Sequence, residues 1–302
     1  MSVRLGSGGF GSVYKGELEN GTIVAVKELK IKDIHEHEKE VVPVFEAFHH
    51  EVVLMSQLNH PNIVKLLGII QNTTKFVMEF VTCGVLSDRL YDEKQEDLPM
   101  DIKKKILVDV ANGMNYLHSQ NPPIVHRDLR SFNIFISSYE ADRLVAKVGD
   151  FGLSFPCPTE LQDVMPTWQW LAPECIDGFS TYNEKSDLYS FGVVIYEMMS
   201  RQMPFTDKEE FITKIEEILS PEQLLNEAFL KQLEGSGFRL MDGKAVREEF
   251  QTQTIKTEIV SNGLRPTVDP SWPPLIQSLL NDCWSASPDS RPSWTEILDR
   301  LS

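Results

Sequence analysis

The chain has 302 residues, of which 41% are hydrophobic and 25% are charged, values typical of a soluble globular protein with a large buried core. Its formal net charge of −16 disfavours non-specific binding to nucleic acid or to an anionic membrane surface. We therefore expect no nucleic-acid partner. No apolar run is long enough to form a membrane-spanning helix, so we expect no membrane insertion either.

The cysteines and the first residues predict a cytoplasmic protein. The opening string MSVRLGSGGF contains no apolar stretch of the kind that signal peptides need. The four cysteines, Cys83, Cys157, Cys175 and Cys283, are scattered without a CxxC pair, which disfavours a zinc site and suits a reducing compartment.

A glycine-rich hairpin is predicted at the start of the chain, in the string LGSGGFGSV from Leu5 to Val13. Gly6, Gly8 and Gly11 allow a backbone to approach phosphates closely and to turn with a positive φ. Leu5 and Val13 are apolar and flank the loop, as closure over an adenine ring requires. Glycines also make ordinary hairpins, so this pattern depends on the motifs that follow.

A strand is predicted over residues 22–29, because apolar residues recur through TIVAVKEL. Ala25 is small enough for a purine ring to stack against it. A lone lysine in a strand, such as Lys27, is usually only solvated, and its role again depends on its neighbours. A helix follows over Phe45–Leu58, with apolar residues such as Met55 on one side.

Further elements are predicted from their periodicity. The strings NIVKLLGII (62–70) and KFVMEF (75–80) predict two strands that complete a small antiparallel sheet. The ranges Pro99–Ser119 and Glu184–Ser200 predict two long helices, each with an apolar face, and WPPLIQSLLNDCW and WTEILDRL predict the closing helices.

The string HRDLRSFN, from His126 to Asn133 and here called the catalytic loop, carries side chains suited to phosphoryl transfer. Asp128 can accept the proton of an incoming hydroxyl, and Asn133 can hold a magnesium ion beside the phosphates. Arg130 can neutralise charge on the moving γ-phosphoryl group. The apolar strand Ile134–Ile136 holds the far end of the loop, so that all three side chains can face one point. A plain polar turn explains this string if it is taken alone.

The motifs occur in the order that protein kinases have: GxGxxG, Ala-x-Lys, a helix glutamate, HRD, DFG at residues 150–152 and APE at residues 172–174. The chain therefore resembles a protein kinase catalytic domain over nearly its whole length. The resemblance implies an α+β fold of two lobes in a single domain, 1–302. Residues 1–81 would form a small antiparallel sheet with one helix, and residues 82–302 a larger, mainly helical lobe with an activation segment at 150–174.

The resemblance also implies the roles of the site residues, with ATP and Mg²⁺ as cofactors. Lys27 would hold the α- and β-phosphates and would be held by Glu51, with Glu46 as the alternative partner. Asp150 would bind magnesium together with Asn133. Backbone groups of Glu79 and Val81 would bond the adenine edge. The implied nucleotide-binding residues are Leu5, Gly6, Gly8, Gly11, Val13, Ala25, Lys27, Met78, Glu79, Val81 and Phe135.

Three structural contacts are implied in the same way. They are the packing of Phe151 beside Met55, Leu66 and His126, the pairing of Glu174 with Arg291, and the capping of the catalytic-loop backbone by Asp187.

Two residues bear on which hydroxyl is phosphorylated. Thr167 stands where tyrosine kinases usually have proline, and serine/threonine kinases commonly have threonine there to contact the catalytic aspartate. Arg130 replaces the lysine usual in serine/threonine kinases and is seen among tyrosine kinases. This mixture resembles the tyrosine-kinase-like group of serine/threonine kinases, including the Roco type. We expect a serine/threonine kinase acting on proteins; the alternatives are a tyrosine or dual-specificity kinase and a nucleotide-binding pseudokinase or scaffold.

Three further expectations concern loops and chain ends. The interval from Pro204 to Pro266, 62 residues (266 − 204), exceeds what the family implies, so an insert is expected at about 220–253. It contains a predicted helix, EQLLNEAFLKQL, and is either a docking site for a regulatory partner or a neutral loop expansion. Ser154, Thr159 and Thr167 are hydroxyls available for phosphorylation, with Arg127 as the clamp. Because the glycine loop begins almost at once, we expect a piece of a larger protein or a shortened one.

Overall fold

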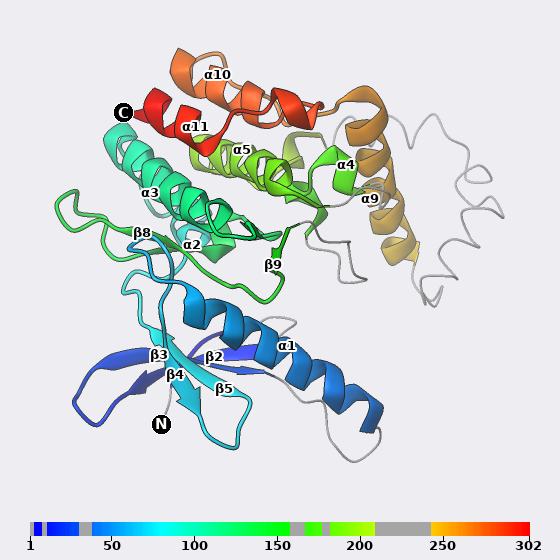
Figure 1. The fold of residues 1–302 in the computed structure, drawn as a ribbon. Helices are drawn as coiled ribbons and strands as arrows, with labels where there is room; N and C mark the ends of the chain where they lie inside the picture. Colours follow the sequence, from blue (N-terminus) through cyan, green and yellow to red (C-terminus); the bar gives the residue numbers. More distant parts are fainter. Residues whose placement is uncertain (1–2, 8–10, 30–37, 158–166, 177–181, 209–242) are drawn as a thin grey trace.

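The molecule has two lobes, one built on a sheet and the other on helices (Figure 1). A computed structural model describes residues 3–7, 11–29, 38–157, 167–176, 182–208 and 243–302; in 38–44 and 243–251 it describes the backbone alone. This architecture is the α+β fold expected from the sequence. Among the described helices, none is both long enough and apolar enough to cross a bilayer.

The smaller lobe contains a five-stranded antiparallel sheet of order β1-β2-β3-β5-β4. The strands are β1 Arg4–Ser7, β2 Gly11–Glu17, β3 Ile23–Leu29, β4 Leu66–Ile70 and β5 Lys75–Glu79. The helix α1, Glu38–Gln57, lies along this sheet (Figure 1). It begins before the predicted Phe45 and ends at Gln57, one residue before the predicted end. Met55 in the helix and Leu58 just after it are both buried, as the apolar pattern requires.

The fourth strand is shorter than predicted, because its first residues bind the other lobe. The amide of Asn62 donates to the carbonyl of Ala146 at 2.9 Å, and its own carbonyl accepts from the N–H of Val148 at 2.9 Å. The N–H of Val64 donates to the carbonyl of Val148 at 2.8 Å. Residues 62–64 therefore join the sheet lobe to the helical lobe, and the strand begins only at Leu66.

The helical lobe is organised around α5, Glu184–Ser200, whose bounds are those predicted. Asn183 and Ser186 form a capping box at its start, which satisfies free backbone N–H groups. Residues from Ser186 to Met198 are buried on every side of the helix, not only on one face, because other helices surround it. The remaining helices are α2 Leu86–Leu90, α3 Met100–His118, α4 Pro173–Ile176, α9 Gly243–Asn262, α10 Pro274–Cys283 and α11 Trp294–Leu301.

Two short strand pairs hold the catalytic loop at both ends. Before the loop, β6 Ile124–Val125 pairs with β9 Phe155–Pro156. After it, β7 Ile134–Ile136 pairs with β8 Ala146–Val148. Both ends of the loop are thus tied to strands that flank the DFG residues, which brings the two motifs together.

The predicted insert at about 220–253 lies mostly outside the described residues, including the string EQLLNEAFLKQL. Its last part, residues 243–253, forms the first half of α9. Further along this helix, Ile255 and Ile259 are buried in a small cluster with Phe205. The C-terminal half of α9 is therefore part of the helical lobe.

Candidate active site

Lys27 and Glu51 meet at the interface of the sheet and α1. The Nζ of Lys27 lies 2.6 Å from Oε1 of Glu51, and both side chains are nearly fully buried. The alternative partner, Glu46, is exposed on the same helix. Burial opposes the charge on Lys27, but the neighbouring carboxylates of Asp150 and Glu51 outweigh it and raise the pKa of the lysine. Burial raises the pKa of Glu51, and the charge of Lys27 opposes this rise.

Asp150 approaches the same ammonium group from the other lobe. Its Oδ1 lies 2.7 Å from Nζ of Lys27, and its backbone is left-handed, with φ of 64°. Burial acts against its ionisation, yet the charge of Lys27 prevails and lowers the pKa of Asp150. Phe151 is fully buried, with its ring centroid 5.3 Å from that of His126. It shares one core cluster with Met55, and Leu66 packs against that cluster, as the resemblance implied.

In the catalytic loop, the side chains of Arg130 and Asn133 both contact the carboxylate of Asp128. The Nδ2 of Asn133 donates to the backbone carbonyl of Asp128 at 2.7 Å and to its Oδ2 at 2.8 Å. The Nε of Arg130 lies 3.2 Å from Oδ1. Burial raises the pKa of Asp128, and the nearby charge of Arg130 moderates this rise. The loop thus presents a carboxylate whose orientation both neighbours fix.

Asp187, near the start of α5, holds the loop backbone as expected. Its carboxylate accepts from the N–H groups of His126 at 2.8 Å and of Arg127 at 3.0 Å. It also contacts Nε2 of His118 at 2.9 Å and accepts from the hydroxyl of Tyr182 at 3.0 Å. Because four groups converge on one buried carboxylate, the start of the catalytic loop has little freedom to move.

The predicted phosphate loop is described at Gly6 and Gly11, whereas Gly8 lies outside the described residues. At Gly11 a Cβ atom would lie 2.4 Å from the carbonyl oxygen of Glu28, so only glycine fits against β3. The positive φ expected at the loop glycines is not found at Gly6 or Gly11; near this hairpin it occurs at Gly21, with φ of 83°. Close packing between strands therefore accounts for Gly11.

The residues predicted around the adenine lie along the edge where the lobes meet. Ala25 and Met78 are direct partners across β3 and β5. Val81 follows β5 and is buried, and its carbonyl accepts from Gly84 N at 3.3 Å. Phe135 forms an isolated bridge with Val85 in the same connection.

Three other predicted nucleotide contacts lie on the sheet lobe. Leu5 is exposed, and Val13 is half-buried opposite Lys27 in the strand register. The carboxylate of Glu79 accepts from Nζ of Lys147 at 3.0 Å and from the N–H of Lys65 at 2.8 Å. The side chain of Glu79, the last residue of β5, therefore holds the end of this strand to Lys65 and to Lys147.

The predicted phosphorylation sites differ in accessibility. Ser154 is fully buried, and its hydroxyl donates to the carbonyl of His126 at 3.1 Å, so it is not an accessible acceptor in this conformation. Thr159 lies outside the described residues. Among the described residues, the hydroxyl of Thr167 makes no hydrogen bond to Asp128, in contrast to the expected contact. The guanidinium of Arg127 lies over the ring of Phe155 at 5.5 Å.

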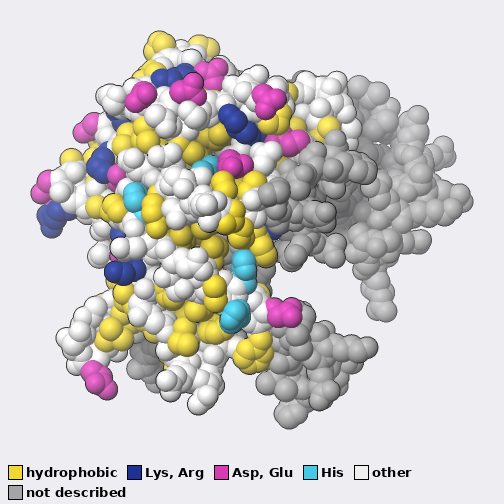
Figure 2. Space-filling view, in the orientation of Figure 1, with side chains coloured by type: hydrophobic (Ala, Val, Ile, Leu, Met, Phe, Trp, Pro, Cys, Tyr) yellow, Lys and Arg dark blue, Asp and Glu magenta, His cyan; other side chains and the backbone are white. Residues whose placement is uncertain are grey.

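His50 is a contact residue that the sequence patterns do not single out. Its ring stacks on Phe155 with centroids 4.0 Å apart, and its Nε2 lies 2.6 Å from the carbonyl oxygen of Ser154. These contacts tie α1 to the residues after DFG, immediately beside Glu51 in the helix. A cavity of about 400 Å³ lies beside this contact, between α1 and residues 120–124. Figure 2 shows histidine and hydrophobic side chains gathered where α1 meets the helical lobe.

Glu197 is a second residue that the patterns miss. It is fully buried in α5, and its carboxylate accepts hydrogen bonds from the hydroxyl and the N–H of Ser131 in the catalytic loop. An acidic residue inside the apolar string GVVIYEMM is the signal that could have found it.

Comparisons with known proteins agree with this geometry. The family model described as "Protein kinase domain" matches residues 1–301. The chain is 36% identical over 308 residues to the probable serine/threonine-protein kinase roco11 of Dictyostelium discoideum, covering 99% of this chain and 18% of that protein. It is 35% identical over 301 residues to the probable serine/threonine-protein kinase roco7 of the same organism, covering 99% of this chain and 10% of that protein.

Another relative is named for a different property. Cyclic GMP-binding protein C of Dictyostelium discoideum is 30% identical over 324 residues, covering 100% of this chain and 11% of that protein. The chain thus spans less than a fifth of the length of these relatives. The expected resemblance to Roco-type kinases is confirmed by the first two matches. With the two-lobed fold and a family match from end to end, the chain belongs to the protein kinase domain family.

Proposed function

We propose that this chain transfers the γ-phosphoryl group of ATP to serine or threonine hydroxyls of protein substrates. Protein kinase domains use ATP and a divalent metal ion. The observation that carries the proposal is the convergence of Lys27, Glu51 and Asp150, with Nζ of the lysine 2.6 and 2.7 Å from the two carboxylates. This contact joins the sheet, α1 and the DFG residues at one point, which is the arrangement that phosphoryl transfer needs.

In the proposed mechanism, Asp128 accepts a hydrogen bond from the substrate hydroxyl and takes its proton as the oxygen attacks the γ-phosphorus. The bond from that phosphorus to the oxygen bridging the β- and γ-phosphates breaks, and ADP leaves with the bridging oxygen. Lys27, held by Glu51, binds the α- and β-phosphates. Arg130 supplies positive charge beside Asp128, where charge spreads over the transferring group. Catalysis then rests on positioning and on electrostatic stabilisation by residues that other contacts already fix.

Asn133 and Asp150 fit a magnesium ion by the chemistry of their donors. Mg²⁺ prefers oxygen ligands and is usually held by one or two carboxylates together with nucleotide phosphates. The amide nitrogen of Asn133 is turned toward Asp128, which leaves the amide oxygen for a metal. The described residues contain no group of three or more His, Cys, Asp or Glu side chains suited to a metal ion. A bound Mg²⁺ would neutralise charge on the phosphates.

Serine/threonine specificity is supported by the residue type at Thr167, where tyrosine kinases usually have proline. It is also supported by the relatives, which are named probable serine/threonine-protein kinases. Arg130 favours the second candidate, a tyrosine or dual-specificity kinase, because it stands where serine/threonine kinases usually have lysine. On the cysteine pattern we also propose a cytoplasmic location. A regulatory partner at residues 220–253 is a further proposal that rests on the sequence alone.

The test is transfer of radiolabelled phosphate from ATP to the chain itself and to a generic basic protein, followed by acid hydrolysis. The matched pair of variants is Asp128→Asn and Asp101→Asn, since Asp101 is exposed on α3. Label is expected on serine and threonine, with a loss of about 10²- to 10⁴-fold in Asp128→Asn and none in Asp101→Asn. Label on tyrosine would favour the second candidate. ATP binding without transfer would indicate a pseudokinase or scaffold.

A further inference from the structure

The carboxylate of Glu197 is a buried acidic group outside the proposed nucleotide site, and it contacts several functional segments. Its residue is 0% exposed, and it forms no ion pair with any residue that the structure describes. Burial raises the pKa of Glu197, and hydrogen bonds from Ser131, Tyr91 and Trp170 oppose this rise. Burying a carboxylic group without an ion partner is costly unless several donors satisfy it. A specific set of donors is therefore to be expected around it.

Those donors come from three separate segments. Oε1 accepts from the hydroxyl of Tyr91, at 2.5 Å, and from the hydroxyl of Ser131. Oε2 accepts from the N–H of Ser131 at 3.2 Å and from Nε1 of Trp170 at 2.7 Å. Tyr91 follows α2, Ser131 belongs to the catalytic loop and Trp170 lies near the end of the activation segment. One side chain of α5 thus joins all three.

Two of these donors lead directly to Asp128. Ser131 starts the single 3-10 turn that ends at Asn133, so fixing Ser131 fixes the backbone that presents Asn133. Trp170 acts on the other side, because the guanidinium of Arg130 lies over its ring at 5.8 Å. Arg130 in turn lies 3.2 Å from Asp128. Both polar neighbours of the proposed proton acceptor therefore depend on groups that Glu197 binds.

We propose that Glu197 is a positioning residue for phosphoryl transfer. It holds the catalytic loop and the end of the activation segment in one arrangement, acting through Ser131 and Trp170 and contacting no reacting atom. The catalytic part of this inference rests on the proposed kinase activity. Its structural part, ordering of the loop, is measurable whether or not the chain transfers phosphate.

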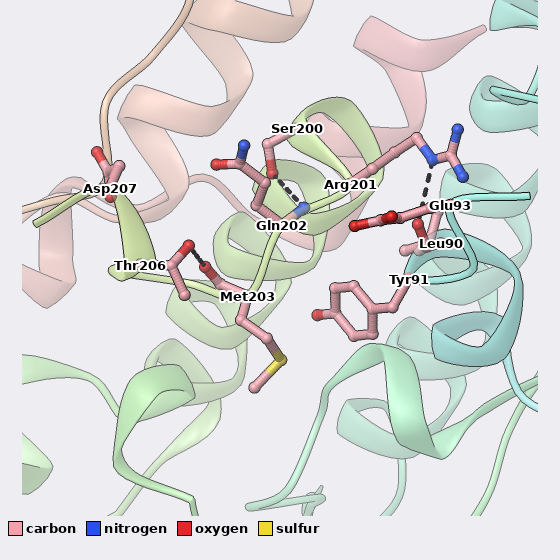
Figure 3. A pocket seen from close by; sticks show the side chains of 9 residues that line it. All are labelled: Leu90, Tyr91, Glu93, Ser200, Arg201, Gln202, Met203, Thr206 and Asp207. Carbon is pink, nitrogen blue, oxygen red and sulfur yellow. Dashed lines mark hydrogen bonds between the residues drawn. The ribbon is translucent and has the colours of Figure 1, made fainter. Parts of the chain in front are cut away.

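Tyr91 is the member of this network that borders open space. Its ring lines a cavity of about 810 Å³ between α2 and the end of α5, and Figure 3 shows Tyr91, Glu93 and Met203 around that hollow. Arg201 fastens the same region, donating to the carbonyls of Leu90 at 3.1 Å and Asp92 at 2.8 Å. The backbone on both sides of Tyr91 is therefore held without the tyrosine hydroxyl. For this reason Tyr91→Phe should remove one donor to Glu197 at little structural cost.

The test compares two substitutions of Glu197 with one matched control. Glu197→Leu removes all four hydrogen bonds. Glu197→Gln retains them in principle, because its oxygen accepts from the two N–H groups and its NH₂ donates to the two hydroxyl oxygens. The control is Tyr196→Leu, since Tyr196 is the next residue of α5, is buried and packs toward Trp272 and Trp284, at 6.0 and 6.4 Å, away from the loop.

Two readouts are needed: amide hydrogen exchange of segments 126–133 and 167–172, and the kinetic constants for ATP. In Glu197→Leu, exchange is expected to rise in both segments and kcat to fall by about 10²-fold, with little change in KM for ATP. Glu197→Gln is expected to restore most of both. Tyr91→Phe is expected to give a smaller loss of kcat, and Tyr196→Leu none.

The proposal is overturned if Glu197→Leu matches Tyr196→Leu in exchange and kcat, or if Glu197→Gln is as damaging as Glu197→Leu. Should Glu197→Leu not fold, Trp170→Phe removes one donor while keeping an aromatic ring. Wild-type exchange and kcat in Trp170→Phe would then overturn the proposal, and losses in both would support it. An inactive wild-type chain in which Glu197→Leu still loosens both segments would overturn the kinase activity and support loop positioning.

Discussion

The guanidinium of Arg291 binds the carboxylate of Glu174 through two hydrogen bonds, of 2.6 and 2.8 Å, across 117 residues of sequence. The arginine side chain is fully buried, and two further N–H groups of it donate to the carbonyls of Ser285 at 3.0 Å and Lys185 at 2.8 Å. A planar guanidinium in this two-point contact fixes both the position and the angle of its partner. The end of the activation segment is thereby fastened to the helical lobe.

Removing this arginine is expected to destabilise the helical lobe. Arg291→Ala leaves the carboxylate of Glu174 and two carbonyl groups without their donor, which should cost about 3–5 kcal/mol of unfolding free energy. Equilibrium unfolding in urea measures the loss. The control is Arg300→Ala, because Arg300 forms a partly exposed pair with Asp282 at 2.8 Å that should be worth about 1 kcal/mol or less. Equal losses in the two variants would contradict this prediction.

The two glutamates of α1 provide a matched test of the lysine partner. Glu51→Gln removes the charge that holds Lys27 and is expected to lower kcat/KM for ATP by about 10²-fold. Glu46→Gln should leave kcat/KM unchanged, because Glu46 is exposed and Lys27 contacts Glu51 instead. Steady-state kinetics with varied ATP decides between them. A larger loss in Glu46→Gln would reverse the assignment.

The elevated pKa of Asp128 should appear in the pH dependence of kcat/KM. The carboxylate must be ionised to accept a proton, and burial raises its pKa. As the pH is lowered, activity should therefore be lost at a higher pH than it would be with an aspartate of ordinary pKa. Arg130 favours the ionised form. Arg130→Ala should therefore raise the pKa further and move the acid limb of the profile to higher pH, in addition to lowering the overall rate.

The control for this profile is Arg143→Ala, since Arg143 is exposed and pairs with Glu140 away from the site. Its acid limb should coincide with that of the wild type. An unmoved or lowered limb in Arg130→Ala would show that the limb reports a group other than Asp128.

Ser154 should behave as a buried structural hydroxyl and not as an activating phosphorylation site. Ser154→Asp places a carboxylate where the residue is fully buried beside the carbonyl of His126, so loss of stability and activity is expected. Ser154→Ala should cost only about 1 kcal/mol, the value of one hydrogen bond. Thermal unfolding and phosphate transfer measure both effects, with Ser271→Asp as an exposed control. Activation by Ser154→Asp would refute this view.

Local patterns predicted the long helices well, because an apolar stripe and its end signals lie within one element. The helix α3 runs from Met100 to His118 inside the predicted range, and α5 has the predicted bounds. The same reasoning was wrong for Asn62, which the apolar pattern assigned to a strand. Its side chain and carbonyl instead bind residues 84 and 86 positions further along, at Ala146 and Val148. A period of two cannot reveal such a contact.

The sequence by itself determined the motifs, their order and the family, since residue types at short spacings carry that information. Only the tertiary structure decided which glutamate meets Lys27, that Ser154 is buried and that Glu197 binds Ser131 from 66 residues away. The physical reason is range. Helix and strand periods and turn residues act between near neighbours, whereas a buried carboxylate finds its donors only after distant segments have packed together.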